Sequence, residues 1–129
     1  MKVRLMFFTW LGMALLHSTP AMSHHSNVAF DQTKLMTLTG IVKEFRWVNP
    51  HTQLVLTVDD PKAGKVDWTI EGRAPGIYIR AGWTKKSLVS GDTVTVTLSL
   101  SRDGSKSGLL NRITKADGTV LPQSEPPVQ

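Results

Sequence analysis

Histidine is the residue type best placed for chemistry here, because the chain contains no cysteine to supply a thiolate. There are four histidines: His17, His24, His25 and His51. Two of them are adjacent near the N-terminus, and His51 follows an Asn-Pro dipeptide. Neutral imidazole is the commonest protein ligand of metals. The three histidines after position 23 are therefore candidate ligands of one transition metal ion.

The first 23 residues have the features of an export signal. Lys2 and Arg4 are followed by an apolar region of 12 residues, 5–16, and then by Ala21-Met22-Ser23. Small residues at the first and third of these positions predict cleavage before His24. A membrane-spanning helix needs about 20 apolar residues, so the short run favours a cleaved signal over an anchor. Cleavage would remove His17 and leave His24, His25 and His51.

Cleavage before His24 would give that residue both a free α-amine and an imidazole, which chelate a metal in one ring. A second imidazole, from His51 or His25, would complete a three-nitrogen site, the arrangement called a histidine brace. Planar nitrogen-rich sites suit Cu(II) better than nickel or zinc, and a closed zinc site usually has four protein ligands. Cleavage one residue earlier leaves Ser23-His24-His25, whose amine, amides and imidazole also bind Cu(II). The alternative interpretation is a solvated terminus, with His51 capping a turn.

Four further residues are candidates for ligand binding. Trp47 and Asn49 lie in or beside the Asn-Pro-His turn, Trp83 follows a glycine that ends a predicted helix, and Glu71 lies near a turn. They suggest a second hypothesis, a small-ligand or protein-interaction module with exposed aromatics near Trp47 and Trp83; core packing is the competing explanation. No carboxylate pair has a spacing that indicates a general acid and base, so no catalytic residue is predicted. A copper-dependent oxidative enzyme is the third hypothesis.

Charge restricts the expected partners. The formal net charge is +5, and loss of Lys2 and Arg4 would leave 13 basic and 10 acidic residues, a net charge of +3. The basic residues are scattered, whereas nucleic-acid binders usually carry a basic stripe. We therefore expect a transition metal ion or an exported protein as partner and no nucleic acid. The expected location is periplasmic or secreted, without a stable membrane anchor after signal cleavage.

The remaining sequence must supply the scaffold, and its patterns predict mostly β-strands. Segments 38–48, 52–58, 66–72 and 93–100 are β-branched or alternate in polarity, and 109–121 indicates a strand pair about Asp117-Gly118. Between them, 73–83 has proline near its start and Gly82 near its end, which predicts one short helix. Residues 24–36 form a polar lead that either pairs at a sheet edge or remains loose. The proline-rich segment 122–129 is expected to be disordered.

Three strands, a helix and two more strands are the layout of an OB-type barrel. We therefore predict an all-β domain over 24–121, a small five-stranded OB-type barrel with one short helix between strands three and four. A short β-sandwich is the competing architecture. A closed barrel would protect strand edges, which suits a small domain without disulfides.

Several short motifs together resemble a known family. They are the His24-His25-Ser26 start, Asn49-Pro50-His51, and Arg80-Ala81-Gly82-Trp83, together with Phe30-Asp31, Leu38-Thr39-Gly40, Phe45, Trp47, Trp68, Glu71, Pro75, Leu88, Gly91-Asp92 and Asp117-Gly118. This series resembles the bacterial exported family known as domain of unknown function 6152, from His24 to about Leu121. The resemblance implies a bacterial, exported, single-domain protein and implies no activity.

Overall fold

The computed structural model describes residues 28–124. It contains β1 (Phe30–Arg46), β2 (Gln53–Asp60), β3 (Gly64–Glu71), α2 (Pro75–Arg80), β4 (Thr93–Ser101), β5 (Ser107–Lys115) and β6 (Val120–Leu121). Each predicted strand and the helix are therefore present. The predicted signal peptide, His24 and His25 lie outside the described residues.

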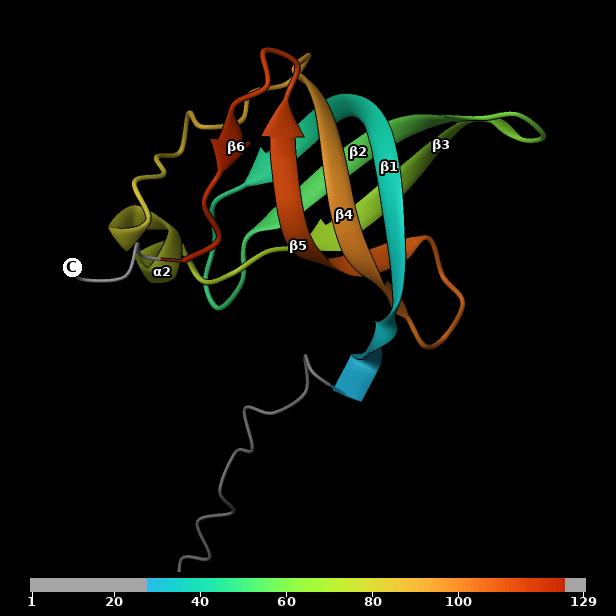
Figure 1. Ribbon diagram of the computed structural model, residues 1–129, viewed down its shortest axis with the longest axis horizontal. Helices are drawn as coiled ribbons and strands as arrows, with labels where there is room; N and C mark the ends of the chain where they lie inside the picture. Colours follow the sequence, from blue (N-terminus) through green and yellow to red (C-terminus); the bar gives the residue numbers. More distant parts are fainter. Residues whose placement is uncertain (1–27, 125–129) are drawn as a thin grey trace, which may run out of the picture.

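The strands form a closed ring. Their hydrogen-bonded order is β3-β2-β1-β4-β5-β6, and a parallel pairing of β3 with β5 joins the two sides. All other neighbours are antiparallel, and α2 lies between β3 and β4 in the chain. Figure 1 shows the ring, with α2 at one side and the β2–β3 hairpin projecting from the other. This is the OB-type topology, and the β-sandwich alternative does not apply.

Strand β1 is longer than predicted. It begins at Phe30, inside the segment that the sequence marks only as a polar lead, and pairs with β4 before turning to pair with β2. The pairing register shifts between Asp31 and Leu35, where side chains leave strict alternation. At Gly40 the strand passes so close to β2 that a Cβ atom would collide with the carbonyl oxygen of Thr57. Glycine therefore permits the bend by which one strand serves both sides of the ring.

The core fills the interior of the ring. Alternation in β4 places Val94, Val96 and Leu98 inward, where each is at most 1% exposed. Trp68 of β3 is also buried, as its strand phase predicts. Outward-facing threonines of β1 and β4 hydrogen-bond across the strands, Thr39 to Thr95 at 2.9 Å. A single apolar interior with a polar exterior explains how the domain folds without disulfides.

An aromatic cluster closes the ring at α2. Tyr78 of α2 stacks on Trp83 with ring centroids 4.2 Å apart, and Phe45 and Trp47 pack beside them. Burial raises the pKa of the Tyr78 hydroxyl above its usual value. Helix α2 starts at a proline, as the sequence predicts, because proline lacks the N–H that is unpaired in the first turn.

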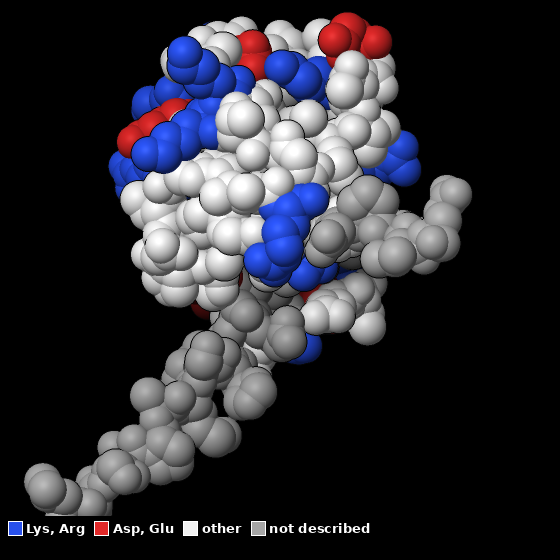
Figure 2. Space-filling model, turned by 90° about the vertical axis from the view of Figure 1, so that its left-hand side faces the viewer, with Lys and Arg blue, Asp and Glu red and all other residues white. Residues whose placement is uncertain are grey.

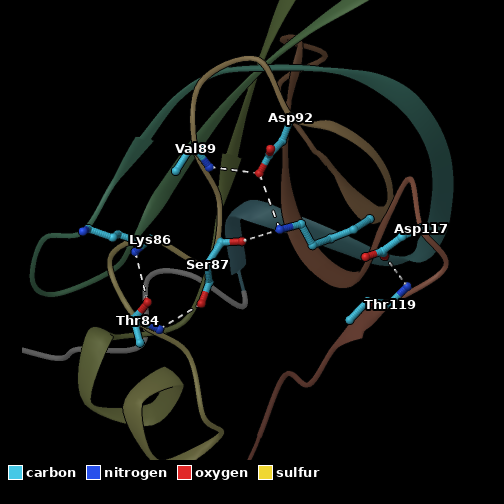
Figure 3. Close-up of polar contacts among 8 residues, drawn as sticks. Thr84, Lys86, Ser87, Val89, Asp92, Asp117 and Thr119 are labelled. Atoms are coloured by element: carbon cyan, nitrogen blue, oxygen red, sulfur yellow. Dashed lines mark hydrogen bonds and ion pairs between the residues drawn. The ribbon is translucent and has the colours of Figure 1, made fainter.

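A polar network holds the loop between α2 and β4 against β5. The Asp92 carboxylate accepts a 3.1 Å hydrogen bond from the Val89 backbone, and Lys115 of β5 lies 3.7 Å from the same carboxylate (Figure 3). The Lys115 ammonium also donates to the Ser87 carbonyl oxygen at 3.3 Å. The loop therefore has a defined position over the end of the ring.

No helix within residues 28–124 is long and apolar enough to cross a membrane.

Charges on the face that contains α2 are mixed. Figure 2 shows basic side chains gathered toward one upper corner, with acidic side chains among them, and a further basic patch lower on the face beside a broad area of uncharged residues. The view confirms that basic residues do not form a continuous stripe on this face.

Candidate functional site

A pocket of about 310 Å³ lies at the seam where β3 and β5 close the ring. Its walls come from the start of β1, the β1–β2 loop, the segment from the end of β3 into α2, and β5. The polar lining residues are Gln32, His51, Glu71, Arg73 and Asn111. Two of the residues predicted from sequence, His51 and Glu71, therefore share one pocket. A second pocket, beside Asp31 and Arg102, is lined by none of the predicted residues.

His51 and Glu71 are in direct contact in this pocket. The Nδ1 atom of His51 lies 2.9 Å from Oε1 of Glu71, and their side chains are 41% and 26% exposed. Oε1 is itself buried, yet among the described residues nothing donates a hydrogen bond to it. The proximity of the imidazole thus does not satisfy the carboxylate oxygen. A buried oxygen without a donor is unusual and marks a place where a cation or a donor group would be favourable.

The residues that follow His51 and Glu71 fix the position of the pair. Thr52 is 1% exposed, and both its backbone N–H and its hydroxyl donate to the Arg73 carbonyl oxygen, at 3.1 and 3.0 Å. The Gly72 N–H donates to the Thr52 carbonyl oxygen at 2.8 Å. A Cβ atom on Gly72 would collide with the Thr52 hydroxyl oxygen, so glycine permits this close approach. The two backbones that carry His51 and Glu71 are therefore locked together.

The bond between Asn49 and Pro50, in the turn before His51, is a cis peptide. Asn49 is exposed, and Trp47 is half-buried at the edge of the aromatic cluster. Neither residue lines the pocket that contains His51 and Glu71. The Asn-Pro-His motif therefore contributes only its histidine to the pocket.

Trp83 is buried, at 3% exposure, which corrects the hypothesis of an exposed aromatic at this position. Its indole N–H donates to the Pro122 carbonyl oxygen, and its ring stacks on Tyr78. The physical reason is that Trp83 completes the apolar interior beside α2. An interaction module that uses exposed rings near Trp47 and Trp83 could rely only on the half-buried Trp47.

The described residues supply at most two neighbouring candidate metal ligands, His51 and Glu71. Between residues 28 and 124, no three His, Cys, Asp or Glu side chains gather in a way that would hold a metal ion. His51 and Glu71 form a pair, and His24 and His25 lie outside the described residues. Among the residues that line the pocket, Gln32 is the closest in sequence to His25, seven positions after it.

Three polar residues of the pocket were not predicted: Gln32, Arg73 and Asn111. Gln32 lies within the register shift of β1, and Asn111 lies at the shift where β4 pairs with β5. Such irregularities depend on how strands pair, so residue alternation alone does not reveal them. A glycine directly before Arg73 is the one sequence signal of a close backbone approach.

No curated protein matches the chain. A solved structure with a similar fold is that of the mitochondrial single-stranded DNA binding protein Rim1 from S. cerevisiae. It is 16% identical, the match covers 64% of this chain and 94% of that chain, and the TM-score is 0.47.

The exclusion of nucleic acid as a partner is corrected, because it was based only on scattered charge and a low net charge. Because phosphate contacts need only a few suitably placed basic groups, scattered charge is not sufficient ground for an exclusion.

The comparison with protein families gives a match over most of the chain. The family described as Family of unknown function (DUF6152) matches residues 13–112, which include the pocket and all strands except the end of β5 and β6. The resemblance inferred from the His-His, Asn-Pro-His and Arg-x-Gly-Trp motifs is therefore confirmed, and the chain belongs to the Family of unknown function (DUF6152).

Proposed function

We propose that this protein is an exported binding module that holds a transition metal ion, Cu(II) above nickel or zinc, through His51 and the N-terminal histidines His24 and His25. The observation that carries the proposal is the contact of His51 with the buried Glu71 oxygen in the pocket at the β3–β5 seam. Imidazole beside a carboxylate is a common arrangement at metal sites, because the carboxylate orients the ring or adds negative charge.

The N-terminal histidines precede a strand that contributes to this pocket. Gln32 of β1 lines the pocket, and His25 lies seven positions before it. Phe30 is buried at the start of β1, and the Ala29 carbonyl oxygen accepts a hydrogen bond from the Arg102 backbone, so only the segment from His25 to Val28 can serve as a tether. An extended chain covers about 3.3–3.6 Å per residue, so this tether spans roughly 11 Å at most. The proposal therefore requires this short segment to return toward His51.

The metal preference follows from the donor atoms. Signal cleavage before His24 supplies an α-amine and an imidazole from one residue, and His51 or His25 adds a further nitrogen. A set of nitrogen donors in one plane favours Cu(II), both by the order of affinities and by geometry. Cleavage before Ser23 also leaves a planar copper-binding terminus, but that terminus would not need His51.

The proposed role is metal handling or sensing outside the cytoplasm, in the periplasm or after secretion. Oxidative copper chemistry is the less favoured role, because it additionally requires an open copper position facing a substrate. Consumption of a reductant and oxygen by the copper-loaded protein would distinguish an enzyme from a carrier.

The test has two steps. Mass spectrometry of the exported protein identifies its first residue, expected to be His24. Competitive Cu(II) titration then compares the mature protein with His51→Ala, which is expected to bind at least tenfold more weakly. Equal affinity of the two proteins would show that His51 is not a ligand, and sub-micromolar binding that survives loss of both His24 and His51 would exclude the brace.

A further inference from the structure

The contact between His51 and Glu71 has the distance of an ion pair but lacks a hydrogen bond to the carboxylate oxygen. In an ion pair the imidazole N–H would donate to the carboxylate, but Oε1 of Glu71 accepts no hydrogen bond from any described residue although Nδ1 is 2.9 Å away. Both atoms are of the kinds that bind transition metals, imidazole nitrogen and carboxylate oxygen. They lie side by side in the same pocket wall.

Their separation can be compared with the edge of a metal coordination polyhedron. Metal–nitrogen bonds of about 2.0–2.1 Å and metal–oxygen bonds of about 2.0–2.2 Å are usual. At a 90° angle such bonds place the two donors about 2.9 Å apart, whereas a tetrahedral angle places them about 3.4 Å apart. The observed 2.9 Å is also the ordinary separation of a hydrogen-bonded pair, but it matches a right-angled pair of ligands better than a tetrahedral one. Right angles are typical of tetragonal Cu(II) and of octahedral ions.

We propose that Glu71 is itself a metal ligand, with Oε1 bound at about a right angle to Nδ1 of His51. This inference rests on the proposed function, and it adds an anionic oxygen to a set that otherwise contains only nitrogen. It also explains why a buried carboxylate oxygen lacks a hydrogen-bond donor: its partner is a cation.

The fold fixes the distance between His51 and Glu71. Thr52 and Arg73 are joined by two hydrogen bonds to one carbonyl oxygen, and Gln53 pairs with Glu71 in the register of β2 and β3. A pre-formed pair loses little conformational entropy on binding, which favours affinity. The right-angled bite further favours Cu(II) over tetrahedral Zn(II).

The inference is tested with the mature protein, Cu(II) alone and Glu71→Gln, which keeps the size of the side chain but removes its charge. We expect at least a tenfold loss of Cu(II) affinity and a changed copper electron paramagnetic resonance spectrum, while thermal unfolding of the metal-free protein is unchanged. The matched control is Glu44→Gln, an exposed strand glutamate paired with Arg46 away from the pocket, for which affinity and spectrum should equal the wild type.

The two proposals fail in different ways. If His51→Ala weakens binding while Glu71→Gln binds Cu(II) with wild-type affinity and spectrum, Glu71 is not a ligand and the proposed function stands. If the wild-type protein does not bind Cu(II), the proposed function and this inference are both overturned. If Glu71→Gln does not fold, Glu71→Asp replaces it: retained charge with a shorter reach should still lower the affinity, and wild-type affinity would overturn the inference.

Discussion

The indole N–H of Trp83 donates a 2.6 Å hydrogen bond to the carbonyl oxygen of Pro122, 39 residues further along the chain. Beside it, the Tyr78 hydroxyl donates to Oε1 of Gln123 at 2.9 Å. The first residues of the proline-rich segment thus satisfy two polar groups of the buried aromatic cluster. The folded domain extends at least to Gln123, past the boundary at Leu121 that the sequence suggests.

Truncation after Leu121 should therefore destabilise the domain. It leaves the buried Trp83 N–H and Tyr78 hydroxyl without these acceptors, and each unsatisfied group costs about 1–3 kcal/mol. Urea unfolding followed by tryptophan fluorescence measures the change in unfolding free energy. Truncation after Ser124 is the control and should leave stability unchanged. Equal stability of both truncated proteins would contradict the role assigned to Pro122 and Gln123.

Gly40→Ala should destabilise the ring at the bend of β1. The added methyl group would collide with the Thr57 carbonyl oxygen, and relief requires β1 and β2 to separate. Forced overpacking of this kind costs about 1–3 kcal/mol. Gly76→Ala in α2 is the matched control, because the nearest atom to its added Cβ is 3.9 Å away. Comparable thermal unfolding of the two variants would argue against the proposed close approach.

Thr52→Val should lower stability and loosen the pair formed by His51 and Glu71. The valine keeps the shape but loses the hydroxyl that donates to the Arg73 carbonyl oxygen, a loss of about 0.5–1.5 kcal/mol. Thr93→Val, on the exposed face of β4, serves as the control and should stay within about 0.5 kcal/mol of wild type. Chemical denaturation measures both. A Thr52→Val protein as stable as the control would remove Thr52 from the explanation of the site geometry.

Asp103 should titrate far below an ordinary aspartate. Hydrogen bonds from the side chain and backbone of Ser105, and from the Ser101 hydroxyl, lower its pKa from 3.8 to about 2. Because the pKa is lowered in the folded state, the stabilisation is present above pH 3.8 and is lost as the pH falls through about 2.

The measurement for Asp103 is carboxyl NMR titration. The double variant Ser101→Ala, Ser105→Ala should raise the titration midpoint of Asp103 toward 3.8. It removes the hydrogen bonds from the two serine hydroxyls and keeps the one from the backbone of residue 105. An unchanged midpoint in the double variant would show that these hydrogen bonds are not the cause.

Strict alternation explains which strands could be predicted. Val94, Val96 and Leu98 alternate with threonines, so strand 93–100 and its inward face follow from sequence and agree with β4. The start of β1 at Phe30 does not follow, because the register shift between Asp31 and Leu35 interrupts the alternation there. The parallel β3–β5 pairing joins segments that are distant in sequence, and no local pattern encodes it.

In the candidate site, too, the residue types could be predicted from the sequence, whereas their contacts could not. Histidine beside Asn-Pro and a glutamate at a strand end were recognisable, so His51 and Glu71 were both candidates. Their contact was not recognisable, because it depends on the register that pairs Gln53 with Glu71 and on the Thr52 anchor. Trp83 was ambiguous since its burial is decided by Tyr78 and Pro122, which reach it from α2 and from the end of the chain.

The most direct test of the central claim is NMR of the mature protein with ¹⁵N-labelled histidine, during addition of substoichiometric Cu(II). A paramagnetic ion broadens the signals of the imidazoles that bind it. If one copper is held by the N-terminus and the pocket together, the His24 and His51 imidazole signals will lose intensity in parallel from the first addition. Loss of the N-terminal signals alone, with the His51 imidazole unaffected up to one equivalent of copper, would contradict a shared site.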